Sequence, residues 1–121
     1  MPNNGSKKIL AVLDDLFFTV KIAAAAKQAG LEIEVVKDEK QVFEKAKEHP
    51  MLIIVDLNGN SFEPLKLLTK LKSDAETKNV RIIGFVSHVQ GELKQKAHET
   101  GCDMVLARSA FSQNLPMLLK R

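Results

Sequence analysis

The stretch LIIVDLNGNS, residues 52–61, decides the fold, because it places a carboxylate directly after a fully apolar run. Four branched apolar residues lead into Asp56, and Asn58, Gly59 and Asn60 follow. An apolar run of this length between turn-forming residues predicts a strand that is buried on both faces. Open α/β folds keep their ligand sites at the carboxyl ends of such strands. We therefore treat Asp56 as a candidate functional residue, with the polar end of a strand as the alternative.

Further apolar runs alternate with amphipathic segments on both sides of this strand. We predict strands at residues 9–13, 32–36, 52–55, 81–86 and 104–107, and helices at residues 16–30, 38–49, 64–71, 91–101 and 112–121. Pro116 suits the last helix only in its first turn, where Ser112 or Asn114 would cap it. The alternation predicts an α/β fold, a doubly wound, flavodoxin-like parallel sheet of five strands in the order 2-1-3-4-5.

Length and composition indicate one domain with an aliphatic core. The chain has 121 residues, of which 45% are hydrophobic and 27% charged, and it lacks Trp and Tyr. We expect a flexible head at 1–7 and a single domain at 8–121. The single cysteine, Cys102, excludes an internal disulfide and is expected to be a buried, inert thiol. Since no apolar run is long enough to span a bilayer, we expect a cytoplasmic protein without a membrane partner.

The charge pattern argues against nucleic-acid binding. The formal net charge is only +3, and lysines alternate with glutamates at 44–49 and 70–78. This pattern is typical of solvated helix faces. Nucleic-acid binders more often cluster basic residues on one face, with aromatic residues for stacking.

The predicted strand order brings several polar side chains to one edge of the sheet. Asp14 and Asp15 follow the first strand, which lies beside the strand that ends at Asp56. Neighbouring carboxylates repel one another, so they need a cation such as Mg²⁺ or a fixed positive side chain between them. Ser87 follows the fourth strand and Arg108 the fifth, and they add a hydroxyl and a guanidinium to the same edge.

With these residues in this order, the sequence from Lys8 to Leu119 resembles the receiver domain of bacterial two-component response regulators, in the CheY-like superfamily. The resemblance implies that Asp56 accepts a phosphoryl group from a histidine kinase or phosphotransfer protein. It implies that the hydroxyl of Ser87 contacts the phosphoryl group. Arg108 occupies the place of a lysine that pairs with the same group.

The resemblance also implies a Mg²⁺ ion. Its implied ligands are the side chains of Asp14, Asp15 and Asp56 and the backbone carbonyl of Asn58. An alignment without a gap places Asp14 at the second acid of the family's pair and Leu13 at the first. A shift by one residue places an acid at both positions, and the sequence leaves this register open.

Several positions depart from the family's pattern and make this sequence atypical. Arg108 replaces a lysine, and Ser109 replaces a proline with a cis bond, so we expect a trans bond there. Val105 stands in place of a switch aromatic residue. His88 replaces a small residue beside the acceptor, and we interpret it as a gate or a loop-packing residue. Phe111 is expected to pack under the last helix, with a partner-docking anchor as the alternative.

Three functions agree with these residues, and we favour the first. It is a single-domain receiver, monomeric or weakly dimeric, that acts on a downstream protein in trans and is no enzyme beyond self-phosphorylation and autodephosphorylation. It predicts an acyl phosphate at Asp56 that requires Mg²⁺. The second is a pseudo-receiver interaction module without a phosphate switch and without Mg²⁺ affinity. The third is a flavodoxin-like small-molecule or cofactor binder, against which the acidic and apolar segment DDLFF at 14–18 argues.

Overall fold

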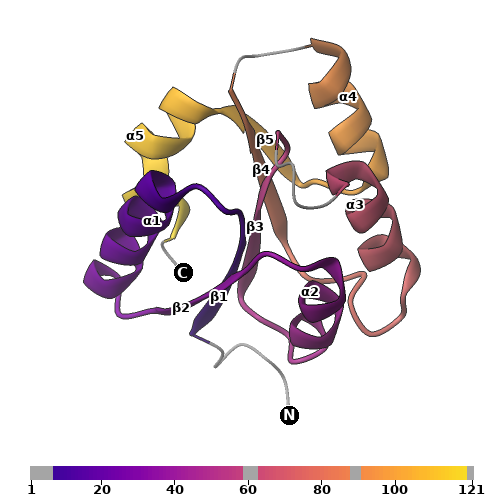
Figure 1. Cartoon of the computed structure of the whole chain (residues 1–121), viewed down its shortest axis with the longest axis horizontal. Coiled ribbons are helices and arrows are strands. Elements are labelled where there is room, and N and C mark those ends of the chain that lie inside the picture. The colour runs from indigo at the N-terminus through magenta and orange to yellow at the C-terminus, as the bar shows by residue number, and fades with distance from the viewer. Residues whose placement is uncertain (1–6, 59–62, 88–90, 120–121) are drawn as a thin grey trace.

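The computed structural model describes residues 7–58, 63–87 and 91–119, which form a parallel sheet with helices on both faces (Figure 1). The strands are β1 (Lys8–Val12), β2 (Glu32–Val36), β3 (Leu52–Asp56), β4 (Ile82–Val86) and β5 (Met104–Ala107). The helices are α1 (Leu16–Gln28), α2 (Glu39–Ala46), α3 (Pro64–Ser73), α4 (Gly91–Thr100) and α5 (Arg108–Leu118). Strands and helices alternate along the chain, as the sequence predicts.

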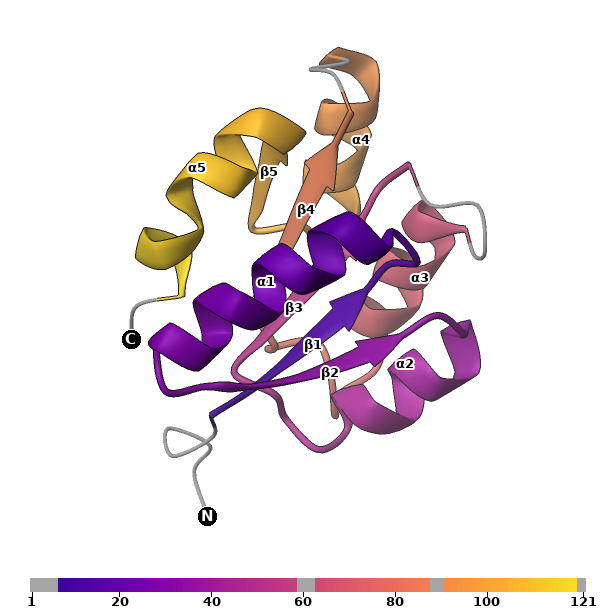
Figure 2. The same ribbon diagram turned by 60° about the vertical axis from the view of Figure 1, so that its left-hand side comes forward.

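The strand order is β2-β1-β3-β4-β5, which confirms the predicted doubly wound topology. Every neighbouring pair is parallel, and Figure 2 shows β1 between β2 and β3. In the register of the central pair, Val12 lies opposite Val55. The carboxyl ends of β1 and β3 therefore lie side by side, at the point where the strand order reverses.

The side chains of each strand alternate between two cores, one on each face of the sheet. On β3, Ile53 and Val55 pack toward α2, α3 and α4, whereas Leu52 and Ile54 pack toward α1 and α5. The first core is aliphatic apart from Cys102, and we call it the aliphatic face; its helices contribute Val42, Ala46, Leu67, Leu68, Leu71 and Ala97. The second contains three phenylalanines and is here called the aromatic face; its helices contribute Phe18, Ile22, Ala26, Phe111 and Leu115.

Short-range capping explains where several helices begin and end. The carboxylate of Asp15 accepts a hydrogen bond from the backbone N–H of Phe18 at 3.2 Å and so caps α1. Pro64 occupies the first turn of α3, as expected for a residue without a backbone N–H. Gly101 follows α4 with a φ of +133°, and a Cβ there would collide with the side chain of Lys72. Only glycine suits that position without strain.

The last helix differs from the prediction. We expected a helix at 112–121 with Pro116 in its first turn, but α5 begins at Arg108 and contains Pro116 in its interior. Asn114 does not cap the helix; its side chain donates to the carbonyl of Ala110 at 2.8 Å. The earlier start places Phe111, which is 1% exposed, one turn before the buried Leu115 on the same face. The stabilisation gained by burying this apolar pair outweighs the loss of the one backbone hydrogen bond that proline removes near the helix end.

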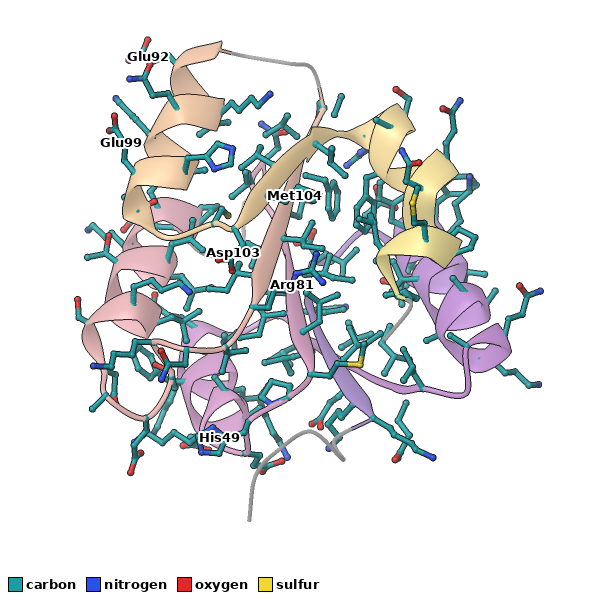
Figure 3. All side chains as sticks on the ribbon, turned by 180° about the vertical axis from the view of Figure 1, so that it is seen from behind. His49, Arg81, Glu92, Glu99, Asp103 and Met104 are labelled. Carbon is teal, nitrogen blue, oxygen red and sulfur yellow. The ribbon has the colours of Figure 1, made fainter. Side chains whose placement is uncertain are left out.

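The outer edge of the sheet at β5 is held by a two-way contact with β4. The backbone N–H of Asp103 donates to the carbonyl of Ile82, and the N–H of Ile82 donates to the carboxylate of Asp103 at 2.7 Å. Figure 3 shows Asp103 at the start of β5, and Glu92 and Glu99 on α4 pointing away from the sheet.

Some predictions fall on residues that the structure does not describe. Most of the predicted head, part of the loop after Asp56 and the gate residue His88 lie outside the described residues. Within the described residues, we find no helix with both the length and the apolar character needed to cross a membrane. There is also no cis peptide bond among them, which agrees with the trans bond expected at Ser109.

Candidate functional site

Asp56 is the last residue of β3 and continues the face of Leu52 and Ile54, the aromatic face. It lies opposite Phe85 in the β3–β4 register, and its side chain is only 6% exposed. Its Oδ1 atom accepts a hydrogen bond from the backbone N–H of Asn58 at 2.9 Å. The strand alternation thus buries a carboxylate under helices α1 and α5 rather than leaving it as the solvated end of a strand.

Opposing influences act on the pKa of Asp56, and burial is the largest of them. Burial raises this pKa above its ordinary value because the charged form loses water. The hydrogen bond from Asn58 and the positive charge of Arg108 lower it, whereas the charges of Asp14 and Asp15 raise it. The net direction is upward, and the nearby cation, the guanidinium of Arg108, opposes it.

Arg108 supplies that cation from the first turn of α5. Its Nη1 atom lies 3.4 Å from Oδ2 of Asp15, and its Nη2 atom lies 3.9 Å from Oδ2 of Asp56. The guanidinium carbon is 4.7 Å from the ring centroid of Phe18 and 5.8 Å from that of Phe85. Cations are attracted to aromatic rings at these distances. One planar group therefore bridges the carboxylates that follow β1 and end β3, while contacting two rings of the aromatic face.

The two acids after β1 occupy distinct places. Leu13, which precedes them, is fully buried in the aromatic face. Asp15 both caps α1 and forms an ion pair with Arg108. Asp14 is exposed and acts on Asp56 through its charge. The structure thus brings Asp15, Asp56 and Arg108 into direct contact.

Asn58 and Ser87 connect the loops after β3 and β4. The side-chain Oδ1 of Asn58 accepts a hydrogen bond of 2.6 Å from the backbone N–H of Ser87. The resemblance implies a role for the backbone carbonyl of Asn58, and this side-chain contact was not anticipated. The backbone N–H of Asn58 donates to Oδ1 of Asp56, and this forms a turn in which an aspartate side chain accepts from the backbone two residues on. The pair holds Ser87 at the same sheet edge as Asp56.

Ser87 and Arg108 line an open groove of about 480 Å³ between α1 and α5. The complete lining is Phe18, Lys21, Ser87, Arg108, Ser109, Ser112 and Gln113. Lys21 donates to the hydroxyl of Ser112 at 2.8 Å and so connects the two helices. Beside this groove, α1 exposes Leu16, Phe17 and Val20, with exposed fractions of 74%, 66% and 67%.

Sequence reasoning missed the contribution of Phe18 and Phe85 to this site. Their rings lie 5.0 Å apart beneath the guanidinium. A signal was available for each: Phe85 lies on β4 two positions before Ser87, which follows that strand, and Phe18 lies on α1 three positions after its N-cap, Asp15. Both spacings place side chains on a shared face. The periodicity alone could not show that a guanidinium would stack there.

The described side chains do not fit a Mg²⁺ site as they stand. Mg²⁺ takes oxygen ligands at about 2.0–2.1 Å in octahedral geometry. Across the described residues, no group of three or more His, Cys, Asp or Glu side chains is placed to hold a metal ion. Oδ1 of Asp15 and Oδ1 of Asp56 each accept a backbone N–H, and the Oδ2 atoms of both face Arg108. The predicted metal ligands therefore stay a prediction, with a guanidinium between two of them.

Comparison with known proteins identifies the fold. No protein-family model matches the sequence, and no curated protein matches it. Among solved structures, the chemotaxis response regulator CheY4 of Vibrio cholerae has a TM-score of 0.81 at 22% identity, covering 94% of this chain and 96% of that one. The phosphorylated cyanobacterial phytochrome response regulator RcpA has a TM-score of 0.80 at 20% identity, covering 95% and 89%.

A third similar structure holds a metal ion. It is the receiver domain of the sensor histidine kinase PA1611 from Pseudomonas aeruginosa, with magnesium coordinated in the active-site cleft. Its TM-score is 0.80 at 18% identity, covering 94% of each chain. These likenesses extend over nearly the whole chain. They show that this protein has the fold of CheY-like response regulator receiver domains.

Proposed function

We propose that this chain, which has the receiver fold, is an atypical receiver domain of a two-component phosphorelay that acts on a downstream protein in trans. The observation that carries the proposal is the gathering of Asp15, Asp56 and Arg108 at the switch point of the sheet, with Ser87 beside them. Ligand sites of doubly wound sheets lie at this place. A strand end without a functional role would not require a buried carboxylate bridged to a second acid.

Each of these side chains has a role in the proposed phosphorylation. Oδ2 of Asp56 would attack the phosphorus of the donor and form an acyl phosphate, while the donor's leaving group takes the bonding electrons. Arg108, which faces that oxygen, would pair with the phosphoryl oxygens through its planar set of N–H donors. The hydroxyl of Ser87 would supply a further hydrogen bond. The donor would be a histidine kinase or a phosphotransfer protein.

The remaining parts of this proposal follow from the resemblance and the composition. Mg²⁺ on Asp14, Asp15, Asp56 and the carbonyl of Asn58 is the cofactor that the resemblance implies. The protein would be cytoplasmic and monomeric or weakly dimeric, with no nucleic-acid or membrane partner. Its own chemistry would be limited to self-phosphorylation and autodephosphorylation. The exposed apolar residues of α1 leave a surface on which a protein partner could dock.

A second candidate function is a pseudo-receiver that binds partners without phosphorylation. The contact of Arg108 with both Asp15 and Asp56 favours it, because this contact holds the site in one arrangement. The burial of Asp56 favours it as well, since a donor must reach that carboxylate. A flavodoxin-like cofactor binder has no comparable support, and an absorbance spectrum of the purified protein tests it directly.

Intact mass spectrometry after incubation with a small phosphodonor separates the two candidates. The protein and its Asp56→Asn variant are incubated with and without Mg²⁺. A labile adduct of one phosphoryl group on the unaltered protein, absent from the variant, is the expected result for a receiver. No adduct on a protein shown to be folded would favour the pseudo-receiver. An adduct that persists in Asp56→Asn would mean that another residue is the acceptor.

A further inference from the structure

The two acids nearest to Arg108 each have one oxygen committed to the backbone and one directed to the guanidinium. Oδ1 of Asp15 caps α1, and Oδ1 of Asp56 binds the N–H of Asn58. Both Oδ2 atoms lie within 4 Å of Arg108 nitrogens, at 3.4 and 3.9 Å. The two Oδ2 atoms carry no backbone hydrogen bond and are therefore the oxygens best placed for a metal ion shared by these carboxylates. The guanidinium already lies between them.

The surroundings of Arg108 hold the guanidinium in that place. The two aromatic residues that the guanidinium contacts, Phe18 and Phe85, are buried, at 4% and 0% exposure. The Nε atom is buried and has no hydrogen-bond partner among the described residues, so the ion pairs and the rings are what retain the group. Because Arg108 is the first residue of α5, its backbone is fixed by the helix as well. Because this cation is attached to the fold, its effective concentration at the two carboxylates is high, and it competes there with a dissolved metal ion.

The residue type matters, because arginine and lysine carry their charge differently. A guanidinium is planar and has several N–H donors in a fixed fork, so it can contact two carboxylates at once. A lysine presents a compact point charge on a flexible chain, which can turn toward one partner and leave the other to a metal. Arg108 thus contacts Asp15 and Asp56 together and offsets one of their two negative charges, from the place that a divalent ion shared by them would occupy.

We infer that Arg108 takes the place of the divalent cation between Asp15 and Asp56, so that this site excludes Mg²⁺ in the unaltered protein. The inference concerns metal binding alone and does not depend on whether Asp56 is phosphorylated. It differs from the Mg²⁺ requirement that the resemblance implies. It also predicts that a single substitution at Arg108 opens the site to a metal.

Titration with Mn²⁺, a spectroscopic probe for Mg²⁺ sites, tests this inference. Electron paramagnetic resonance measures the Mn²⁺ that stays free in solution beside each protein. The unaltered protein is expected to show no saturable binding at millimolar Mn²⁺. Arg108→Gln, which keeps a polar side chain but removes the charge, is expected to bind Mn²⁺ at least about tenfold more tightly, since a repelling charge next to the carboxylates is gone. Mg²⁺ should displace the bound Mn²⁺ in competition.

Two matched variants show which residues act. Lys21→Gln removes a nearby positive charge that binds Ser112 instead of a carboxylate, and it should resemble the unaltered protein. Arg108→Gln combined with Asp56→Asn should lose the binding gained by Arg108→Gln alone. Circular dichroism confirms that each variant is folded. Arg108→Lys serves as a second variant if Arg108→Gln does not fold, and it should also gain affinity for Mn²⁺.

Two results would overturn the inference. The first is saturable Mn²⁺ binding by the unaltered protein that broadens the amide NMR signals of Asn58 and Phe85, which needs no variant at all. The second is the absence of binding in folded Arg108→Gln or Arg108→Lys, because the guanidinium would then not be what keeps the metal out. Either result can occur with or without an acyl phosphate on Asp56, so failure here is distinct from failure of the proposed function.

Discussion

The two faces of the sheet differ in what they bury, and the difference explains where the candidate site lies. On the aromatic face, Phe85 lies 5.0 Å from Phe18 and 4.9 Å from Phe111 between ring centroids. On the aliphatic face, the buried residues among those described include no aromatic side chain. Arg108 and Asp56 are both on the aromatic side. The rings therefore do more than fill space, since they also support the cation of the site.

Stability and site geometry are therefore separable in this fold. The aliphatic face stabilises the sheet through Leu67, Leu68 and Leu71 of α3, which are fully buried and do not contact the site cation. The aromatic face stabilises the sheet and also positions Arg108 between two carboxylates. Substitutions on the two faces should thus cost similar free energy of unfolding but differ in their effect on Arg108.

The largest expected effect comes from truncating the central ring. Phe85→Ala should lower the free energy of unfolding by about 3–5 kcal/mol, because it removes a fully buried aromatic side chain and leaves a cavity. It should also shift the NMR signal of the Arg108 side-chain Nε–H, since one of the two rings beside the guanidinium is lost. Urea denaturation and a side-chain arginine spectrum measure the two effects.

Leu71→Ala on the aliphatic face is the matched control. It should cost about 2–5 kcal/mol for the same reasons of lost burial and cavity formation. The Arg108 signal should stay where it is in the unaltered protein. An equal shift of that signal in both variants would contradict the separation of the two faces.

A smaller loss is expected from overpacking the aliphatic face beside the site. A Cβ at Gly84 would lie 2.8 Å from Cδ1 of Leu57 and 3.1 Å from Sγ of Cys102, both of which are buried. Gly84→Ala should therefore lower the free energy of unfolding by about 1–3 kcal/mol. Thermal denaturation measures this loss. A variant as stable as the unaltered protein would show that this face can relax around an added methyl group.

The pH dependence of stability should reveal the buried carboxylate of the aromatic face. Burial raises the pKa of Asp56, so its stabilising contribution is present below its unfolded pKa and is lost as pH rises through the folded value. Asn at this position cannot ionise. The free energy of unfolding of Asp56→Asn, minus that of the unaltered protein, should increase as pH rises from about 4 to 7. Urea denaturation at several pH values measures it, and a difference that falls with pH would refute it.

The smallest effect concerns Cys102 on the aliphatic face. Here the expected effect is on the rate at which the thiol is chemically labelled, and no change in stability is involved. Burial raises the pKa of its thiol to about 12, so the reactive thiolate is nearly absent at neutral pH. An aromatic disulfide reagent should label Cys102 far more slowly in the folded protein than in urea. Labelling at equal rates would mean that the aliphatic face opens readily near β5.

Local sequence patterns were enough to predict the sheet and its order. Short apolar runs such as 52–55, bounded by turn-forming residues, predicted buried strands, and their alternation with amphipathic segments allowed few topologies. The same reasoning placed Asp56 at the switch point and the thiol of Cys102 in the core. The start of α5 was predicted four residues late, because Phe111 and Leu115 extend the helix through contacts that are distant in sequence.

What the sequence determined by itself is therefore the fold and the set of polar residues at one sheet edge, since both follow from periodicity and strand order. What only the tertiary structure decided is how these residues pair. Asp15 pairs with Arg108, and the guanidinium rests against Phe18. These contacts join α1, β3 and α5 across long separations in sequence. They depend on distances of a few ångströms between side chains, which no periodicity in the sequence specifies.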